Sequence, residues 1–215
     1  MNEKVYSHLE LLIRRYPTLE GIKEQIEKSF EIIRNCYENG GKLIIGGNGG
    51  SCADAEHIVG ELMKGFKKMR PLDNAEKNAL TDIDSALGAQ LAEKLQGGLP
   101  AVALSSQTAL ITAFANDVDA ALSFAQGVMA LGAKGDALLA LSTSGNSKNV
   151  LYAARVAKAL GLTVIALTGK DGGELSTVAD VCISVPADVT YLAQELHLPI
   201  CHYLSAAVEA MLFEE

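Results

Sequence analysis

The sequence contains no tryptophan, and aromatic residues make up only 5% of it. Ala, Leu, Val and Gly supply most of its apolar content, which suits a layered core of helices on a sheet better than a fibrous or disordered chain. No apolar run approaches the roughly 20 residues that a membrane-spanning helix needs, so we expect no membrane partner. The net charge is −8 and no basic block occurs, which argues against a nucleic-acid partner.

The cysteines also lack any CxxC pair, although the chain has four of them. The chain opens on a polar, helix-like stretch rather than on a signal peptide. We therefore expect reduced thiols and a cytoplasmic location. The length of 215 residues is enough for one α/β domain with a sizeable core.

Short apolar runs alternate with helical stretches from residue 42 onward. The five runs occupy residues 42–45, 101–104, 137–141, 163–167 and 181–185. Because strands that alternate with helices pair in parallel, this pattern predicts an α/β fold of three layers, with a five-stranded parallel sheet flanked by helices in a flavodoxin- or Rossmann-like arrangement. No linker interrupts the pattern, so residues 1–215 are predicted to form a single domain.

Three segments lie outside this alternation. Residues 1–40 carry two apolar stripes at helical spacing and predict two N-terminal helices separated by Pro17. Within residues 71–98, Ile83, Leu87, Leu91 and Leu95 show helical spacing and predict an inserted helix over or beside the functional site. The last segment, about 190–212, predicts one long helix that Pro199 should disturb.

Two loops rich in Gly and Ser follow the first and third apolar runs, with the sequences GGNGGS and STSGNS. In a parallel sheet both loops lie at the carboxyl edge, where backbone amides and helix N-termini can bind a phosphate. Neither loop matches a P-loop or a GxGxxG motif. Each alone is also explained as an ordinary turn or helix cap, but two at one edge favour phosphate. The predicted contacts are Asn48, Gly49, Gly50, Ser51, Ser142, Thr143, Ser144 and Ser147.

A histidine and a glutamate follow the first loop at helical spacing. His57 and Glu61 are four residues apart and share one helix face, where they can hold a metal or act on one substrate carbon. By itself, such spacing is more often explained by a pair of residues on a helix surface. A metal-binding or proton-transfer role is favoured because the pair lies two turns after a loop suited to phosphate. In the last helix, His197 is equally well explained as a functional residue or as a packing or hydrogen-bonded one. Cys201 is interpreted as a small core residue and not as a nucleophile.

Taken in order, GNGGS, HxxxE, STSGNS, LTGKDGG and QExHxxxxH resemble the SIS-domain sugar isomerases, and among them the phosphoheptose isomerases. The resemblance covers the chain from Lys42 to its end, apart from the insertion. It implies isomerisation of sedoheptulose 7-phosphate to an aldoheptose 7-phosphate. It also implies a homotetramer with active sites between its subunits.

The resemblance further implies roles for individual residues. Glu61 matches the general base, His202 the general acid, and Asp117 an acidic substrate contact. In several members of the family a zinc ion is held by the residues that match His57, Glu61, Gln194 and His202. Gln194 is also expected to contact the substrate.

The chain departs from the family pattern at two positions besides the insertion. Tyr191 stands where the family has Asp, and Gly65 stands where it has Arg, with lysines nearby. These departures leave the phosphosugar class unaffected and bear on which sugar is bound.

A non-catalytic SIS module, which binds a phosphosugar or a protein partner, is the alternative. A bacterial regulator of replication initiation with the same fold is also similar to this chain. That regulator lacks an acidic residue matching Glu61 and a histidine matching His202. This chain has both, which favours the isomerase.

Overall fold

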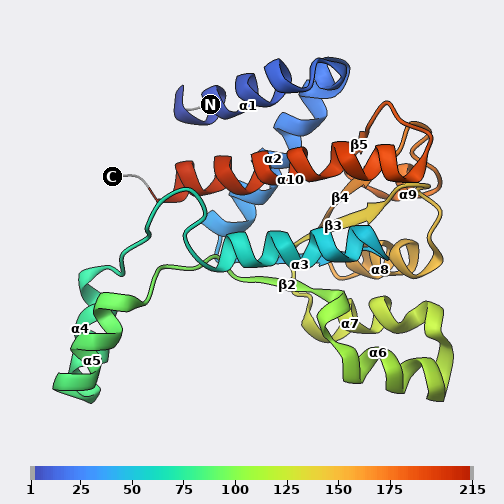
Figure 1. Ribbon diagram of the computed structural model, residues 1–215. Helices are drawn as coiled ribbons and strands as arrows, with labels where there is room; N and C mark the ends of the chain where they lie inside the picture. Colours follow the sequence, from blue (N-terminus) through green and yellow to red (C-terminus); the bar gives the residue numbers. More distant parts are fainter. Residues whose placement is uncertain (1–2, 214–215) are drawn as a thin grey trace.

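The computed structural model describes residues 3–213 and contains one five-stranded parallel sheet (Figure 1). The strands are β1 (Leu43–Gly46), β2 (Ala101–Ala103), β3 (Ala137–Ser142), β4 (Thr163–Thr168) and β5 (Val181–Ser184), in the order β2-β1-β3-β4-β5. Every neighbouring pair is parallel, with Gly46 opposite Ala140 and Ala140 opposite Ala166. The predicted fold class is confirmed, because each strand formed at one of the five apolar runs.

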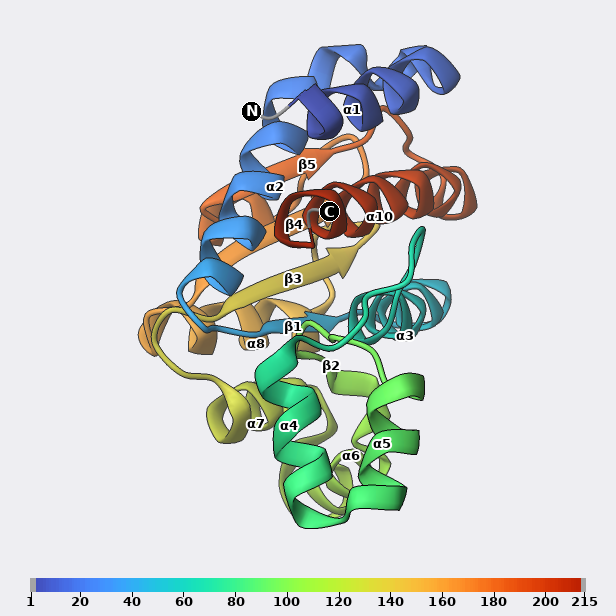
Figure 2. The ribbon, with the colours of Figure 1, turned by 90° about the vertical axis from the view of Figure 1, so that its left-hand side faces the viewer.

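Helices cover both faces of the sheet (Figure 2). Successive strand side chains point to opposite faces, so Ile45 and Leu139 join the core under one set of helices, and Ile44 and Leu138 join the core under the other. The first set is α2 (Lys23–Glu38), α3 (Gly50–Met63) and α10 (Thr190–Leu212). The second set is α7 (Ser123–Leu131), α8 (Lys148–Ala159) and α9 (Leu175–Val178).

The N-terminal helix adds a further layer on one side. Helix α1 (Glu3–Arg15) leads through the short helix η1 (Pro17–Ile22) into α2, and α1 packs on the outer surface of α10 (Figures 1 and 2). Its apolar stripe, which includes Leu9 and Leu12, is buried there. Helix α10 itself continues through Pro199, contrary to the expected disturbance.

Residues 74–94 form two helices rather than the one inserted helix that we expected. Helix α4 (Asn74–Ile83) begins with a capping box, and Asp84 ends it and at once caps α5 (Ser85–Lys94) through the amides of Ala86 and Leu87. The hairpin projects from the body below the C-terminal end of α3 (Figures 1 and 2). At the base of the hairpin, the two connecting segments are joined by a hydrogen bond from Gly97 N–H to Arg70 O at 2.7 Å. The insertion therefore points away from α10 instead of covering it.

A second irregular segment connects β2 to α7. It comprises η2 (Leu104–Ser106), α6 (Thr108–Phe114), the π-helical turn η3 (Ala115–Asp119) and η4 (Ala120–Leu122). Within residues 3–213, no helix has the combination of length and apolarity that crossing a bilayer requires.

Candidate active site

The two Gly/Ser loops meet where the strand order reverses. From β1 the chain adds β2 on one side and β3 on the other, and in open parallel sheets ligands bind at this switch point, outside the carboxyl ends of the strands. Asn48 of the first loop (residues 46–51) donates to Asn149 Oδ1 at 2.9 Å, and Asn149 donates back to Asn48 Oδ1 at 2.8 Å. This amide pair joins the first loop to the first turn of α8, just after the second loop (residues 142–147). Sequence analysis did not single out Asn149, although its place after STSGNS was a usable signal.

Glycine is required in the first loop by its conformation and by close neighbours. Gly49 adopts a φ of +56°, which side chains rarely allow. A Cβ on Gly50 would lie 2.8 Å from both terminal atoms of the Gln194 amide. The structure therefore places Gln194 of α10 over this loop, at the N-terminal end of α3. Ser51 is buried in the first turn of that helix.

The second loop is held by its own serines and by the chain behind it. Ser142 donates to Ser147 Oγ at 3.0 Å and is buried, whereas Thr143 and Ser147 are half-buried and Ser144 is exposed. Residues 169–175 support the loop from behind: Gly169 N–H donates to Thr143 O, and Leu175 N–H donates to Gly145 O, both at 2.9 Å. The loop is thus preorganised, with three hydroxyl-bearing residues at its accessible side.

His57, Glu61 and His202 come together although 145 residues separate the two histidines. Nε2 of His57 lies 3.0 Å from Glu61 Oε1 and 3.1 Å from His202 Nε2, and Nε2 of His202 lies 3.4 Å from Glu61 Oε1. Helices α3 and α10 run side by side in the same direction (Figure 1), which brings the three residues together about two to three helical turns beyond the first loop. Both imidazoles remain about half exposed, whereas only 8% of the Glu61 side chain is exposed.

The three side chains fit a metal ion. All their nearest ligand atoms lie within 4.8 Å of one another, and two imidazoles with one carboxylate form a common zinc ligand set. One Nε2–H on His57 cannot serve both the carboxylate and the second imidazole, whereas a shared cation would satisfy all three. Glu61 Oε2 is also buried without a hydrogen-bond partner among the described residues. Gln194 precedes His202 by eight residues, about 12 Å of helix, so its role as a metal ligand stays a prediction.

Two residues that the sequence did not reveal, Phe66 and Asp54, adjoin the cluster. The ring of Phe66 stacks on His202 with 6.0 Å between ring centroids and 24° between planes. Asp54 lies one turn before His57. Burial raises the pKa of its carboxyl group, and the nearby charges of His57 and His202 partly oppose that shift. Phe66 limits the positions that the His202 ring can take.

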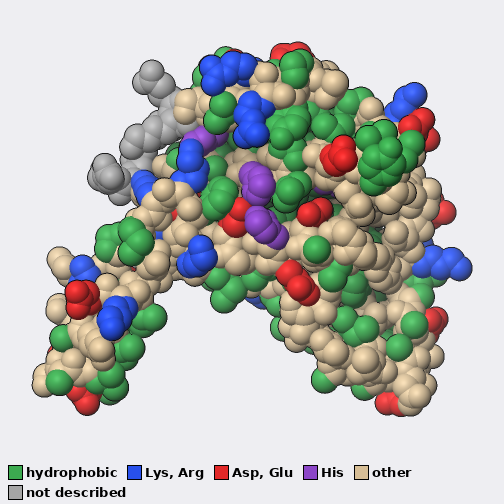
Figure 3. Space-filling model, in the orientation of Figure 1, with side chains coloured by type: hydrophobic (Ala, Val, Ile, Leu, Met, Phe, Trp, Pro, Cys, Tyr) green, Lys and Arg blue, Asp and Glu red, His purple; other side chains and the backbone are tan. Residues whose placement is uncertain are grey.

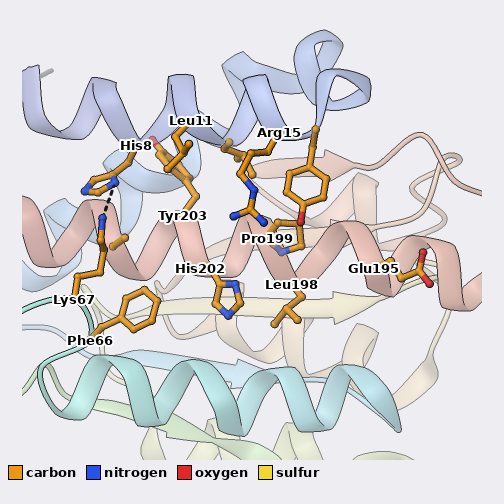
Figure 4. Close-up of a pocket in the computed structure, with 13 residues that line it drawn as sticks. His8, Leu11, Arg15, Phe66, Lys67, Glu195, Leu198, Pro199, His202 and Tyr203 are labelled. Carbon is orange, nitrogen blue, oxygen red and sulfur yellow. Dashed lines mark hydrogen bonds between the residues drawn. The ribbon is translucent and has the colours of Figure 1, made fainter.

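A groove of about 430 Å³ opens beside His202, between α1 and α10 (Figure 4). Leu11 and Leu198 line it together with the basic groups of Arg15 and Lys67. The space-filling view shows the purple histidines and the neighbouring basic side chains on this same face of the molecule (Figure 3). His202 is therefore accessible from this side.

Two positions that the resemblance singled out, Asp117 and Gly65, lie away from the cluster or do not fit the family's residue. Asp117 is exposed in η3, where its Oδ1 accepts a hydrogen bond from Asn116 Nδ2 at 2.8 Å, and Figure 1 shows this segment well below α10. The structure does not bring it to the cluster within one chain. At Gly65 a Cβ would lie 2.2 Å from Lys68 O and 2.5 Å from Gln96 Oε1. No arginine fits there, which accounts for the departure at that position.

His197 has a packing position rather than a catalytic one. It is fully buried, and its Nε2 hydrogen-bonds Thr168 O, at the end of β4, at 3.1 Å. Burial lowers its pKa from 6.5 to about 4, and the bond to Thr168 opposes this shift only partly. The neutral imidazole is therefore the form that the fold requires.

The stability of the protein is expected to fall as the pH is lowered from 6.5 to 4. The unfolded chain takes up a proton on His197 in this window and the folded chain does not, so acid favours unfolding by about 3 kcal/mol. Urea unfolding at a series of pH values measures this slope. In His197→Gln, which keeps a donor for Thr168 O, the slope between pH 4 and 6.5 should become smaller. An unchanged slope would assign the effect to other groups.

Comparison with known proteins agrees with this geometry. Two family models described as SIS domains match residues 12–97 and 97–209. The chain belongs to the SIS-domain family. It is 37% identical over 212 residues to the phosphoheptose isomerase of Shewanella sp. (strain W3-18-1), covering 97% of this chain and 94% of the relative.

Solved structures give the same result over nearly the whole chain. The phosphoheptose isomerase GmhA from Neisseria gonorrhoeae matches with a TM-score of 0.73 at 33% identity, covering 97% of this chain and 98% of the other. A phosphoheptose isomerase from Francisella tularensis matches with a TM-score of 0.74 at 32% identity and the same coverage. Within the SIS-domain family this chain thus groups with the phosphoheptose isomerases and is an isomerase.

Proposed function

We propose that this protein interconverts sedoheptulose 7-phosphate and D-glycero-D-manno-heptose 7-phosphate through an enediol. The observation that supports this proposal most is that His202 Nε2 lies 3.4 Å from Glu61 Oε1. The two residues lie on α3 and α10, whose N-terminal ends lie at the first Gly/Ser loop. The substrate's phosphate would bind at the loops, and its first two carbons would lie at the cluster. The non-catalytic alternative offers no reason for a buried carboxylate beside two imidazoles.

The loops would bind the phosphate through backbone amides and hydroxyls. We assign this contact to the first loop at Asn48, Gly49, Gly50 and Ser51, and to the second at Ser142, Thr143, Ser144 and Ser147. Both loops precede helix N-termini, which favour anions. The buried hydroxyl of Ser142 acts through Ser147, whose Oγ it contacts at 3.0 Å. Gln194, which lies over Gly50, would contact the substrate at this end.

The spacing along α3 suits a seven-carbon sugar. His57 follows Gly50 by seven residues, which is about 10 Å of helix. From phosphorus to C1, a heptose 7-phosphate has eight bonds, and at roughly 1.2 Å of extended length per bond it spans about 10 Å. A five-carbon sugar phosphate would be about 2 Å shorter. A substrate held at the loops therefore reaches the cluster most easily if it is a heptose.

Isomerisation needs a proton moved between two carbons. The Glu61 carboxylate would take a proton from C1 of the ketose while the C2 carbonyl oxygen gains a proton. Return of the proton to C2, with loss of the proton on the C1 hydroxyl, gives the aldose. His202 would donate to or polarise the reacting oxygens from the other side of the cluster.

Zinc is the cofactor that the cluster fits. His57, Glu61 and His202 would hold it, with Gln194 as a further ligand if its side chain turns toward them. When bound, the ion would stabilise negative charge that develops on the substrate oxygens. Phe66, stacked on His202, would keep that imidazole in its ligating orientation.

Chelation followed by cobalt titration tests this assignment without an activity assay. Chelator-treated protein is expected to bind one Co²⁺ per chain and to develop visible absorption bands. His57→Gln removes one of three ligands and should weaken this binding at least about tenfold. Equal affinity of His57→Gln and the unchanged protein would contradict a metal at this cluster.

The substrate assignment is tested by incubating the protein with sedoheptulose 7-phosphate and following the aldose by NMR. Ketose phosphates of five and six carbons serve as the comparison. The seven-carbon substrate should turn over fastest. Turnover of a shorter sugar alone would overturn the heptose assignment, and no turnover on any sugar phosphate would favour the non-catalytic module.

We also propose a homotetramer with sites between subunits. Asp117 lies on an exposed segment distant from the cluster of its own chain, so it would reach a substrate only from a second subunit. Light scattering in solution measures the assembly. A cytoplasmic location stays a prediction from the cysteine pattern.

A further inference from the structure

A fully buried ion pair lies directly behind the active-site cluster. Arg70 Nε donates to Glu209 Oε1 at 2.8 Å, and the two side chains are 0% and 2% exposed. Phe213 covers the guanidinium, with its ring centroid 4.6 Å away. Burying two charges costs solvation that their attraction only partly restores, so such pairs are weak evidence of a purely stabilising role. The contacts that each partner makes indicate another role.

The guanidinium closes the C-terminal end of α3 at Glu61. Its Nη1 donates to Leu62 O at 2.6 Å and its Nη2 donates to Glu61 O at 3.2 Å. Carbonyls in the last turn of a helix have no partner within the helix. Helix α3 ends at Met63, and the following residue, Lys64, is extended with no left-handed glycine cap. Arg70 therefore supplies the cap, and its bond to Glu61 O fixes the backbone that carries the active-site carboxylate.

The carboxylate of Glu209 holds the loop that contacts His202. Its Oε1 accepts a hydrogen bond from the Phe66 amide and its Oε2 accepts one from the Lys67 amide, both at 2.8 Å. Burial alone would raise the pKa of Glu209, but these two amides and Arg70 outweigh it and lower the pKa, so the carboxylate stays ionised. Phe66 in turn stacks on His202.

The pair thus joins the two helices on which the cluster is built. Glu209 follows His202 by seven residues, about two turns, and therefore lies on the same face of α10. One partner fixes the backbone of Glu61 and the other fixes the ring packed against His202. Among the described ion pairs, only Arg70–Glu209, which joins the segment after α3 to α10, makes both connections.

We propose that Arg70 and Glu209 are positioning residues that set the separation between Glu61 and His202. This inference rests on the proposed function, because it assigns those two side chains to the reaction. Because both side chains are buried, neither Arg70 nor Glu209 would touch the substrate. Their effect should therefore appear in kcat and in metal affinity, with little change in KM.

Arg70→Lys is the main test variant. Lysine can pair with Glu209 but cannot also donate to Leu62 O and Glu61 O in the fixed geometry of a guanidinium. We expect a fall of about 10–100-fold in kcat and in Co²⁺ affinity, the range found when partners that orient metal ligands are removed. KM for sedoheptulose 7-phosphate should change little. Glu209→Gln, which keeps one acceptor oxygen, should give a smaller fall in both quantities and decides the question if Arg70→Lys does not fold.

The matched control is Asp136→Asn. Asp136 is a buried carboxylate that accepts bonds from Lys42 Nζ at 2.6 Å and from two backbone amides, at the opposite end of the sheet. The Asp136→Asn variant should lose thermal stability, while its kcat and Co²⁺ affinity stay unchanged. All variants are assayed well below their melting temperatures. Equal changes in kcat and Co²⁺ affinity for the Arg70 or Glu209 variants and for Asp136→Asn would overturn the proposal. Full activity of Glu61→Gln would instead overturn the proposed function, and the Co²⁺ readout separates these two failures.

Discussion

Replacement of Glu61 by glutamine is expected to lower kcat for sedoheptulose 7-phosphate by about 10³-fold, the scale of a positioned general base. Glutamine keeps the size of the side chain and an oxygen that can face His57, but its amide cannot accept the proton from C1. The buried Oε2 of Glu61 has no hydrogen-bond partner among the described residues, so little folding stability should be lost. KM should change far less than kcat, because the proposed phosphate site is at the N-terminal end of α3, away from Glu61. Initial rates measured by NMR over a range of substrate concentrations test both kcat and KM.

Glu56→Gln is the matched control for that variant. Glu56 lies on the same helix, but it is exposed and accepts bonds from Ser105 and Ser106 at 3.2 and 3.4 Å. Its neutralisation removes the same charge from α3 without touching the cluster, and kcat should stay unchanged. If both variants lost activity equally, the effect would come from the charge of the helix and not from proton transfer at Glu61.

Gly145→Ala is expected to raise KM by about 10–100-fold, the weight of one or two hydrogen bonds to a charged phosphate. Gly145 has a φ of +66°, and a Cβ there would lie 2.0 Å from Gly172 O. The second loop and the chain behind it would have to separate, which moves the amides and hydroxyls assigned to the phosphate. Protection against thermal unfolding by inorganic phosphate should weaken in parallel with the rise in KM.

Gly135→Ala separates this loop effect from backbone strain. Gly135 has a φ of +98°, but its Cβ would meet nothing within 4 Å, and it lies just before β3 at the opposite edge of the sheet. Alanine there should cost about 1–2 kcal/mol of unfolding free energy for the left-handed conformation and leave KM unaltered. The assignment of the second loop to phosphate fails if Gly145→Ala loses stability but keeps the KM of the unaltered protein.

The sheet was predictable because its signals are local. Each apolar run between loops is a strand, and parallel pairing alone puts the loops after β1 and β3 at one edge. The i, i+4 spacing of His57 and Glu61 likewise fixes their shared helix face. The match of His202 to this pair came from the resemblance, because no local pattern shows which residue 145 positions away completes a cluster.

Contacts between distant segments were missed for the same reason. The Asn48–Asn149 pair, the stacking of Phe66 and the Arg70–Glu209 ion pair all depend on how α3, α8 and α10 pack. The helical spacing of Ile83, Leu87, Leu91 and Leu95 runs across Asp84 and therefore predicts one helix. That aspartate both ends α4 and caps α5, a local signal that sequence analysis overlooked. Where the resulting hairpin points depends on its anchoring at Arg70 and Gly97, which the spacing does not encode.

A crystal structure of Glu61→Gln with sedoheptulose 7-phosphate tests the central claim most directly. The phosphate should lie between Ser51 and the 142–147 loop, with C1 and C2 of the sugar beside residue 61 and His202. The groove between α1 and α10 offers the competing position, because Arg15 and Lys67 line it. A phosphate bound there, or carbons C1 and C2 far from residue 61 in every subunit, would contradict the account.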